Sequence, residues 1–161
     1  MKTALVIGRF QPFHNGHLEA IRKIIKENGR LLLLIGSTQE TRTQKNPFSA
    51  KEREGMIMGV LKAEGLSSKT RIILLNDENN HERWAGRVKE IAKKADVVYS
   101  GNWLVQHLLK GKYEIRTMAS SVKISATKIR EMIRKNDPEW KKWVPKGISK
   151  YIVENKLEKI I

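Results

Sequence analysis

Continuous apolar stretches alternate along the chain with segments whose apolar residues recur at helical spacing. Residues 3–8 and 30–36 are almost wholly apolar and end in glycine, which is typical of strands buried on both faces of a parallel sheet. Between them, apolar residues from 18 to 25 recur every three or four positions, and Asn28-Gly29 marks a helix end. The pattern predicts a strand–helix–strand unit with a right-handed crossover.

The same alternation continues to about residue 118. It predicts further strands at 70–75, 96–100 and 113–118 and helices at 50–63, 82–93, 125–134 and 145–156. This order is typical of an α/β fold, a doubly wound, Rossmann-like parallel sheet that binds ligands beyond the carboxyl ends of its strands. We therefore expect a single domain over residues 1–161, with a sheet core to about 118 and a helical part from about 119.

The segment directly after the first strand, GRFQPFHNGH at residues 8–17, carries several groups suited to phosphate. Gly8 permits close backbone approach, and Arg9 supplies a permanent charge in a fork geometry. His14 and His17 are three residues apart at a predicted helix start, where the helix dipole attracts anions. Surface or capping histidines, or a metal pair, are the alternatives, although a metal site needs a third ligand that no nearby carboxylate supplies.

A second segment, ISATKIRE at residues 124–131, opens a helix near the C-terminal end of the sequence. Ser125 is a favourable N-cap residue, and Arg130 lies three residues beyond Thr127 on the same helix face. These groups could bind an anion at a helix N-terminus. An amphipathic helix with an ordinary cap explains the same pattern, so this motif is weak by itself.

Composition limits the function classes that remain. The 161 residues contain 32 Lys and Arg against 17 Asp and Glu, a formal charge of +15, which favours partners that carry phosphate. The absence of cysteine excludes disulfides, thiol nucleophiles and cysteine-ligated metals, and favours the cytoplasm. The longest apolar run, 31–35, is far shorter than a membrane-spanning helix, so we expect no membrane association. Charge alone leaves a nucleic-acid-binding domain and an enzyme with a nucleotide substrate both open.

Taken together, the two motifs resemble the signatures of the nucleotidylyltransferase superfamily, (T/H)xGH in the form GRFQPxHxGH and ISxTxxR. Within it the chain is similar to the archaeal-type nicotinamide mononucleotide (NMN) adenylyltransferases, over most of residues 3–134. Four further segments carry this similarity: IGSTQ at 35–39, NPFSAKER at 46–53, residues 77–84 and YSGNWLVQ at 99–106.

The resemblance implies adenylyl transfer from ATP to NMN, giving NAD and pyrophosphate by direct in-line attack. Trp84, whose indole could stack on the cationic pyridinium ring, and Asp77, at the end of the third predicted strand, are the candidates for NMN binding. The resemblance also implies that His14, His17 and Arg130 are catalytic. The residues it assigns to ATP are Gly8, Arg9, Phe10, Gln11, Ser100, Gly101, Asn102, Ser125 and Thr127. Mg²⁺ would arrive with ATP, with no metal ligand from the chain itself. Trp84 could instead be a core residue, Asp77 a cap, and 100–102 an ordinary turn.

Several positions weaken or extend the match. Lys45 stands where relatives are expected to carry Arg, which keeps the charge and loses the bidentate fork. Ala126 removes a hydroxyl inside the second signature. Another acceptor, such as phosphopantetheine or FMN, would require a different opening to the first motif, and no familiar nucleic-acid-binding motif is visible. Residues 140–152 carry apolar side chains at helical spacing, as in a core or a subunit interface, and we expect a homo-oligomer.

Overall fold

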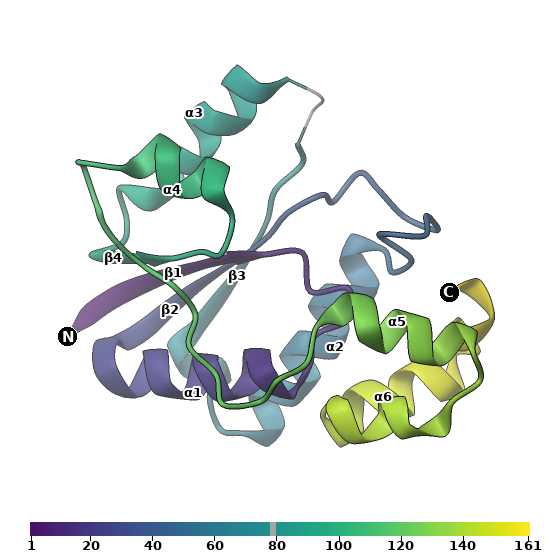
Figure 1. Cartoon of the computed structure of the whole chain (residues 1–161). Coiled ribbons are helices and arrows are strands. Elements are labelled where there is room, and N and C mark those ends of the chain that lie inside the picture. Colours follow the sequence, from purple (N-terminus) through teal and green to yellow (C-terminus); the bar gives the residue numbers. More distant parts are fainter. Residues whose placement is uncertain (78–79) are drawn as a thin grey trace.

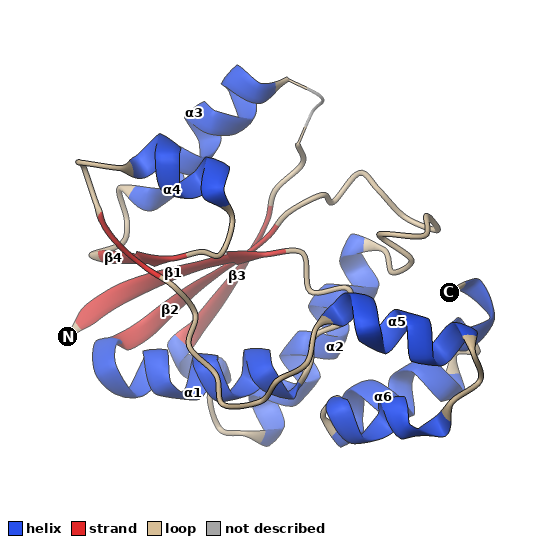
Figure 2. Ribbon diagram, in the orientation of Figure 1, coloured by secondary structure: helices blue, strands red, loops and turns tan. Residues whose placement is uncertain are grey.

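Five parallel strands form the sheet in the computed structural model, which describes residues 1–77 and 80–161 (Figure 2). The strand order is β3-β2-β1-β4-β5, and every pairing is parallel. The strands are β1 Lys2–Gly8, β2 Gly29–Ile35, β3 Thr70–Leu74, β4 Val97–Tyr99 and β5 Glu114–Arg116. The predicted doubly wound α/β sheet is confirmed, and each predicted strand is present within two residues of its expected ends.

Six α-helices within the described residues cover the two faces of the sheet. They are α1 Asn15–Asn28, α2 Ala50–Ala63, α3 His81–Ala92, α4 Trp103–Leu109, α5 Ala126–Arg134 and α6 Lys146–Glu154. Figure 1 shows α1, α2, α5 and α6 on one face and α3 and α4 on the other. Sequence periodicity missed α4, because its seven residues bury only Val105 and Leu109, too few to establish a helical repeat.

Alternating strand residues divide between two hydrophobic clusters, one on each face. On β2, Leu33 belongs to the cluster that includes residues of α1, α2, α5 and α6, whereas Leu34 belongs to the cluster that includes residues of α3 and α4. Trp140, Ile148 and Ile152 are buried in the first cluster, so the core explanation of the C-terminal apolar pattern holds for these residues. Among the described residues, no helix combines the length and the apolar character needed to cross a membrane.

The order of the strands determines where a ligand can bind. The chain leaves β1 through α1 to β2 on one side, and β4 pairs with the other side of β1. Because the connections on either side of β1 lie on opposite faces, the loops after β1 and β4 separate beyond the carboxyl ends of these strands. The first motif follows β1, at the point where such sheets bind their ligands.

Candidate active site

A cavity of about 1190 Å³ opens over the carboxyl ends of the strands. This volume is larger than most small-molecule pockets and suits two nucleotides. Nine of the residues predicted for the site line it: Gly8, Arg9, Phe10, His14, His17, Asp77, Trp84, Gly101 and Asn102. The fold therefore brings together segments that lie almost 100 residues apart in the sequence.

A smaller cavity of about 320 Å³ adjoins the first, because Arg9 lines both. Its wall also includes Thr127 and Arg130 of α5, together with Lys45 and Arg134. Four cationic side chains therefore surround a space large enough for a pyrophosphate group, with Glu131 as the acidic residue in the lining. The charge at position 45 reaches this cavity although Lys replaces the expected Arg.

Arg130 is buried in the wall of the smaller cavity without a full set of partners. Its guanidinium donates to the Gln11 carbonyl at 2.7 Å and to the Thr127 hydroxyl at 3.4 Å. Its Nε is buried and has no hydrogen-bond partner in the described chain. Burial, followed by the neighbouring charges of Arg134 and Arg9, lowers the pKa of Arg130. An anion in the cavity would relieve the repulsion between these cations.

His14 and His17 form a reciprocal cap at the start of α1. The His17 backbone N–H donates to His14 Nδ1 at 3.3 Å, and the His14 backbone N–H donates to His17 Nδ1 at 3.2 Å. The two rings stack with centroids 3.6 Å apart. Because each neutral ring accepts through Nδ1, its proton is on Nε2. Both imidazoles line the main cavity, so each can donate to an anion bound there.

Burial keeps both imidazoles neutral at physiological pH. It lowers the pKa of His14 to about 4 and, together with the neighbouring His14, lowers the pKa of His17 well below its usual range. In the unfolded chain these side chains titrate near ~6.5. As pH falls from 6.5 toward 4, the unfolded state therefore takes up more protons than the folded state, and the free energy of unfolding decreases.

This linkage can be measured. Between pH 7 and pH 4, His14 alone should remove about 3 kcal/mol from the free energy of unfolding. Urea unfolding of the wild type and of His14→Asn at both pH values tests this contribution, because Asn retains an N-cap and does not titrate. The variant should lose less stability on acidification. An equal pH dependence for both proteins would contradict the burial of a neutral His14.

Phe10 packs against the His17 ring of the histidine pair. Its ring is buried and meets the His17 ring edge-on, with centroids 4.9 Å apart. A Cβ at position 8 would lie 2.8 Å from the Phe10 ring, so Gly8 is required for this approach. The structural role of Gly8 is therefore to admit Phe10, in addition to any closeness to a ligand.

Three residues predicted to bind ATP do not line either cavity. The buried Gln11 side chain donates to the Phe48 carbonyl at 2.8 Å and accepts from the Phe48 N–H at 3.0 Å. The Ser100 hydroxyl accepts from the Asn102 N–H at 3.1 Å. Ser125 is the N-cap of α5 and accepts from the Lys128 N–H at 3.2 Å. These side chains hold the surrounding loops, and a direct contact with ATP stays a prediction for them.

Asp77 and Trp84 lie on the β3 side of the main cavity. The Asp77 carboxylate accepts from the Ser37 hydroxyl at 2.8 Å and from the Ser37 N–H at 3.2 Å, which ties the loop after β2 to the end of β3. Trp84 is half-buried and also packs against the cluster under α3 and α4. Both roles considered for Trp84 are therefore compatible with its position. Residues 78 and 79, within the similar segment 77–84, lie outside the described residues.

Arg53 supports the site although sequence reasoning gave it no role. Its side chain on α2 is fully buried and donates to the carbonyls of Arg9, Gly36 and Ser37 at 2.7 to 3.0 Å. Burial is the main cause that lowers its pKa to about 10. One guanidinium thus joins the loops that follow β1 and β2. A charged residue inside NPFSAKER was the available signal, but its acceptors are backbone atoms that no side-chain pattern reveals.

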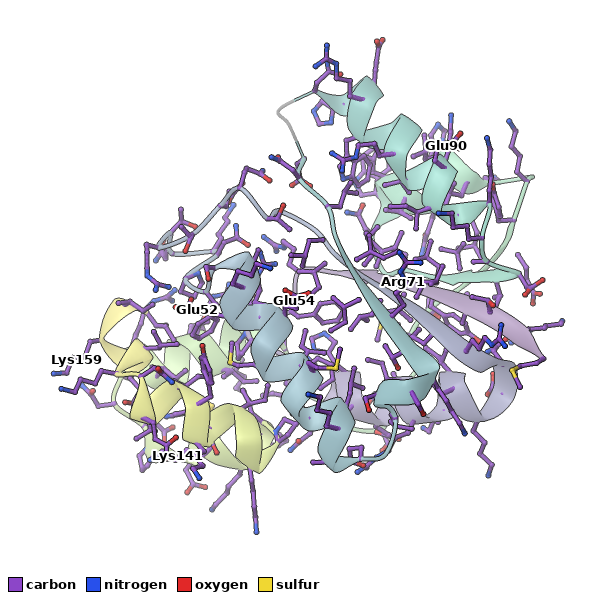
Figure 3. The ribbon with its side chains drawn as sticks, turned by 180° about the vertical axis from the view of Figure 1, so that it is seen from behind. Glu52, Glu54, Arg71, Glu90, Lys141 and Lys159 are labelled. Atoms are coloured by element: carbon purple, nitrogen blue, oxygen red, sulfur yellow. The ribbon has the colours of Figure 1, made fainter. Side chains whose placement is uncertain are left out.

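The loop after β2 is also fastened to α2. Arg42 forms an ion pair with Glu52 at 2.6 Å, and the same guanidinium donates to the Pro47 carbonyl at 2.8 Å. Figure 3 labels Glu52 near the start of α2, on the side of this loop. The contacts brace the segment that carries Lys45 to the smaller cavity.

Two of the cavity residues to which sequence reasoning gave no role add an aromatic ring and a cation. Trp103, at the first position of α4, lines the main cavity with 73% of its surface exposed. Lys123, in the connection between β5 and α5, brings a cation to the same wall. Among the described residues, no three His, Asp or Glu side chains gather as a metal site would require.

Comparison with known proteins identifies the family. The profile of the Cytidylyltransferase-like family matches residues 5–132. A nicotinamide-nucleotide adenylyltransferase of Pyrobaculum aerophilum is 41% identical over 158 residues, which cover 94% of this chain and 88% of that protein. The chain belongs to the archaeal nicotinamide-nucleotide adenylyltransferase family. Another member, from Thermoplasma acidophilum, is 38% identical over 95% of this chain and 86% of its own length.

Solved structures support the fold at lower sequence identity. A bifunctional NMN adenylyltransferase/ADP ribose pyrophosphatase of Francisella tularensis, complexed with AMP and a manganese ion, matches 99% of this chain with a TM-score of 0.79 and 22% identity. The present chain covers 51% of that protein, about half its length. At this identity the likeness shows the shared fold, and the family assignment rests on the archaeal relatives.

Proposed function

We propose that this protein transfers the adenylyl group of ATP to NMN, giving NAD and pyrophosphate. The observation that carries the proposal is the pair of adjoining cavities, a large one lined by His14 and His17 and a small cationic one around Arg130. A nucleoside triphosphate that extends from the large cavity into the small one would place its α-phosphate near the histidines. Its β- and γ-phosphates would then lie among the arginines. Family membership supports the same reaction.

The proposed chemistry needs no general base. The phosphate of NMN is largely ionised at neutral pH, so one of its oxygens can attack the α-phosphorus of ATP directly. The new bond joins that oxygen to the α-phosphorus, and the bond from the α-phosphorus to the bridging oxygen of the β-phosphate breaks. Rate must therefore come from positioning the reactants and stabilising charge.

His14 and His17 would stabilise the α-phosphate in the transition state. Each neutral imidazole offers an Nε2–H to the main cavity while its Nδ1 is held by a backbone N–H. This arrangement fixes the rings before the reaction, so little reorganisation is needed when negative charge develops. The negative charge of a bound polyphosphate would raise these low pKa values and favour the protonated forms.

Arg130 would hold the departing pyrophosphate. Its guanidinium, with Arg9, Lys45 and Arg134 around the same cavity, supplies positive charge for the β- and γ-phosphates. The Thr127 hydroxyl accepts from Arg130 and fixes the guanidinium on its helix. Gly101 and Asn102, at the other side of the main cavity, would lie beside the adenosine.

We propose that Trp84 stacks on the nicotinamide ring of NMN, whose pyridinium carries positive charge. Trp84→Ala should raise KM for NMN by about tenfold and leave KM for ATP within about twofold. Initial rates with each substrate varied in turn test this split. An equal rise in both constants would show that Trp84 acts only through packing against the cluster under α3 and α4.

Mg²⁺ would enter with ATP and be held by phosphate oxygens and water, the coordination that this ion prefers. It would neutralise part of the polyphosphate charge as the transferred group departs. We further propose that residues 1–161 act as one domain, supported by the cluster that joins α1 and α2 to α5 and α6. Association into a homo-oligomer stays a prediction that light scattering can test.

A panel of acceptors tests the proposed function. Purified protein with ATP and Mg²⁺ should release pyrophosphate with NMN and form NAD in equal amount. Parallel reactions with nicotinic acid mononucleotide, phosphopantetheine, FMN and no acceptor define the substrate. Pyrophosphate release only with phosphopantetheine or FMN would show that this compound, and not NMN, is the acceptor. No pyrophosphate release with any acceptor would contradict adenylyl transfer.

A further inference from the structure

The connection between β5 and α5 forms part of the main cavity wall without regular secondary structure of its own. Six of its residues line the cavity, and the segment leads directly to the Ser125 cap; the six are Thr117, Met118, Ser120, Val122, Lys123 and Ile124. Figure 1 shows it running alongside α1 before it reaches α5. Contacts with α1 therefore help to fix the position of this wall, beside the packing of Met118 and Ile124 on the core.

One carboxylate supplies the polar contacts. Glu19, in the second turn of α1, accepts from the Ser120 hydroxyl at 2.7 Å, the Ser121 N–H and hydroxyl at 3.0 Å, and the Val122 N–H at 3.3 Å. Within the described chain, every hydrogen bond that joins residues 118–123 to another element ends on this side chain. Lys23 completes the set with an ion pair at 2.6 Å.

The contact lies next to the histidine pair. A Cβ at Gly16 would lie 3.1 Å from the His14 ring and 3.4 Å from the Ser120 hydroxyl oxygen, so the first turn of α1 packs closely against both. Glu19 is absent from the cavity lining, whereas Gly16, His14 and Ser120 are part of it. The carboxylate therefore acts from outside the cavity on residues that form its wall.

We propose that Glu19 is a positioning residue, whose carboxylate latches residues 120–122 onto α1 and so presets the cavity wall and Lys123 for ATP. The latch links the neighbourhoods of the two signature motifs, because Glu19 lies two residues after His17 and the latched residues 120–122 end three residues before Ser125. The substrate in this inference rests on the proposed function.

The chemistry of the latch depends on an ionised oxygen pair. Two backbone N–H groups and two hydroxyls converge on one carboxylate, which can accept all of them at once. These bonds, with the one from Lys23 contributing most, lower the pKa of Glu19 to about 2. An ordinary carboxylate is ionised at neutral pH even without Lys23. Removing Lys23 should therefore leave the latch intact, whereas Gln at position 19 removes the charge and one acceptor.

The test compares Glu19→Gln with Lys23→Met as the matched control. In Glu19→Gln, amide hydrogen exchange of residues 118–124 should accelerate, Kd and KM for ATP should rise about tenfold, and KM for NMN should change less than about twofold. Lys23→Met should match the wild type in all of these. Ser121→Ala removes one donor, so it should accelerate hydrogen exchange and raise the Kd for ATP by smaller factors than Glu19→Gln. It provides the test if Glu19→Gln does not fold.

Three results would overturn the proposal. They are unchanged exchange and ATP affinity in Glu19→Gln, the same losses in Lys23→Met, and an equal rise in both KM values accompanied by a lower melting temperature. Hydrogen exchange and the Kd for ATP are measured without turnover. If the wild type made no NAD, the proposed function would fail while these two measurements still decided whether the latch exists.

Discussion

Arg130→Met should lower kcat/KM for ATP about a thousandfold, because it removes a buried charge from the pocket assigned to the leaving pyrophosphate. Arg130→Lys should recover only part of this loss, since an ammonium keeps the charge without the planar fork. Steady-state kinetics in the forward direction give the loss. The reverse reaction, from NAD and pyrophosphate, measures the affinity for pyrophosphate directly.

Kinetics of the forward and reverse reactions together assign the role of Arg130. The proposed role predicts that KM for pyrophosphate rises strongly and that KM for NMN changes little. Because Arg130 also donates to the Gln11 carbonyl, a melting temperature is needed beside each rate. A normal KM for pyrophosphate in a stably folded Arg130→Met protein would place the β- and γ-phosphates elsewhere.

His17→Ala should lower kcat by about a hundredfold or more, the usual effect of removing one donor from a site that stabilises a transition state. This substitution also removes the cap on the His14 N–H. His17→Gln is the matched variant, because glutamine at the third helical position can accept the same N–H. Both variants should show the low kcat, with near-normal stability in His17→Gln.

A difference in kcat between His17→Ala and His17→Gln would change the role assigned to His17. If His17→Gln retained a normal kcat, the imidazole would be needed only to cap α1, and stabilisation of the α-phosphate would fall to His14 alone. Single-turnover rates at saturating ATP and NMN distinguish the chemical step from product release.

The strands and most helices were predictable because their signals are local. Buried parallel strands require continuous apolar runs, and the runs at β1 and β2 are among the clearest in the chain. The caps at Ser125 and at the Asn28-Gly29 helix end follow from equally local rules. The short helix α4 was not predicted because it buries only one pair of apolar residues, Val105 and Leu109.

The cavity wall was only partly predictable. Motif spacing placed the histidines and Arg130, but Glu19 and Arg53 act through partners that are distant in sequence or belong to the backbone. Glu19 reaches hydroxyl and N–H groups about 100 residues away, and Arg53 binds three carbonyls. Such contacts exist only after the sheet has assembled, so neither periodicity nor residue type indicates them.

Direct adenylyl transfer is tested most directly by labelling single phosphates of ATP and measuring where the label goes. With Mg²⁺, NMN and ATP labelled on the α-phosphate, all transferred label should appear in NAD, whereas label on the γ-phosphate should appear in pyrophosphate. Without NMN, no label should remain on the protein. Label on the protein, or α-label released as ADP or free AMP in place of NAD, would contradict direct adenylyl transfer between the two cavities.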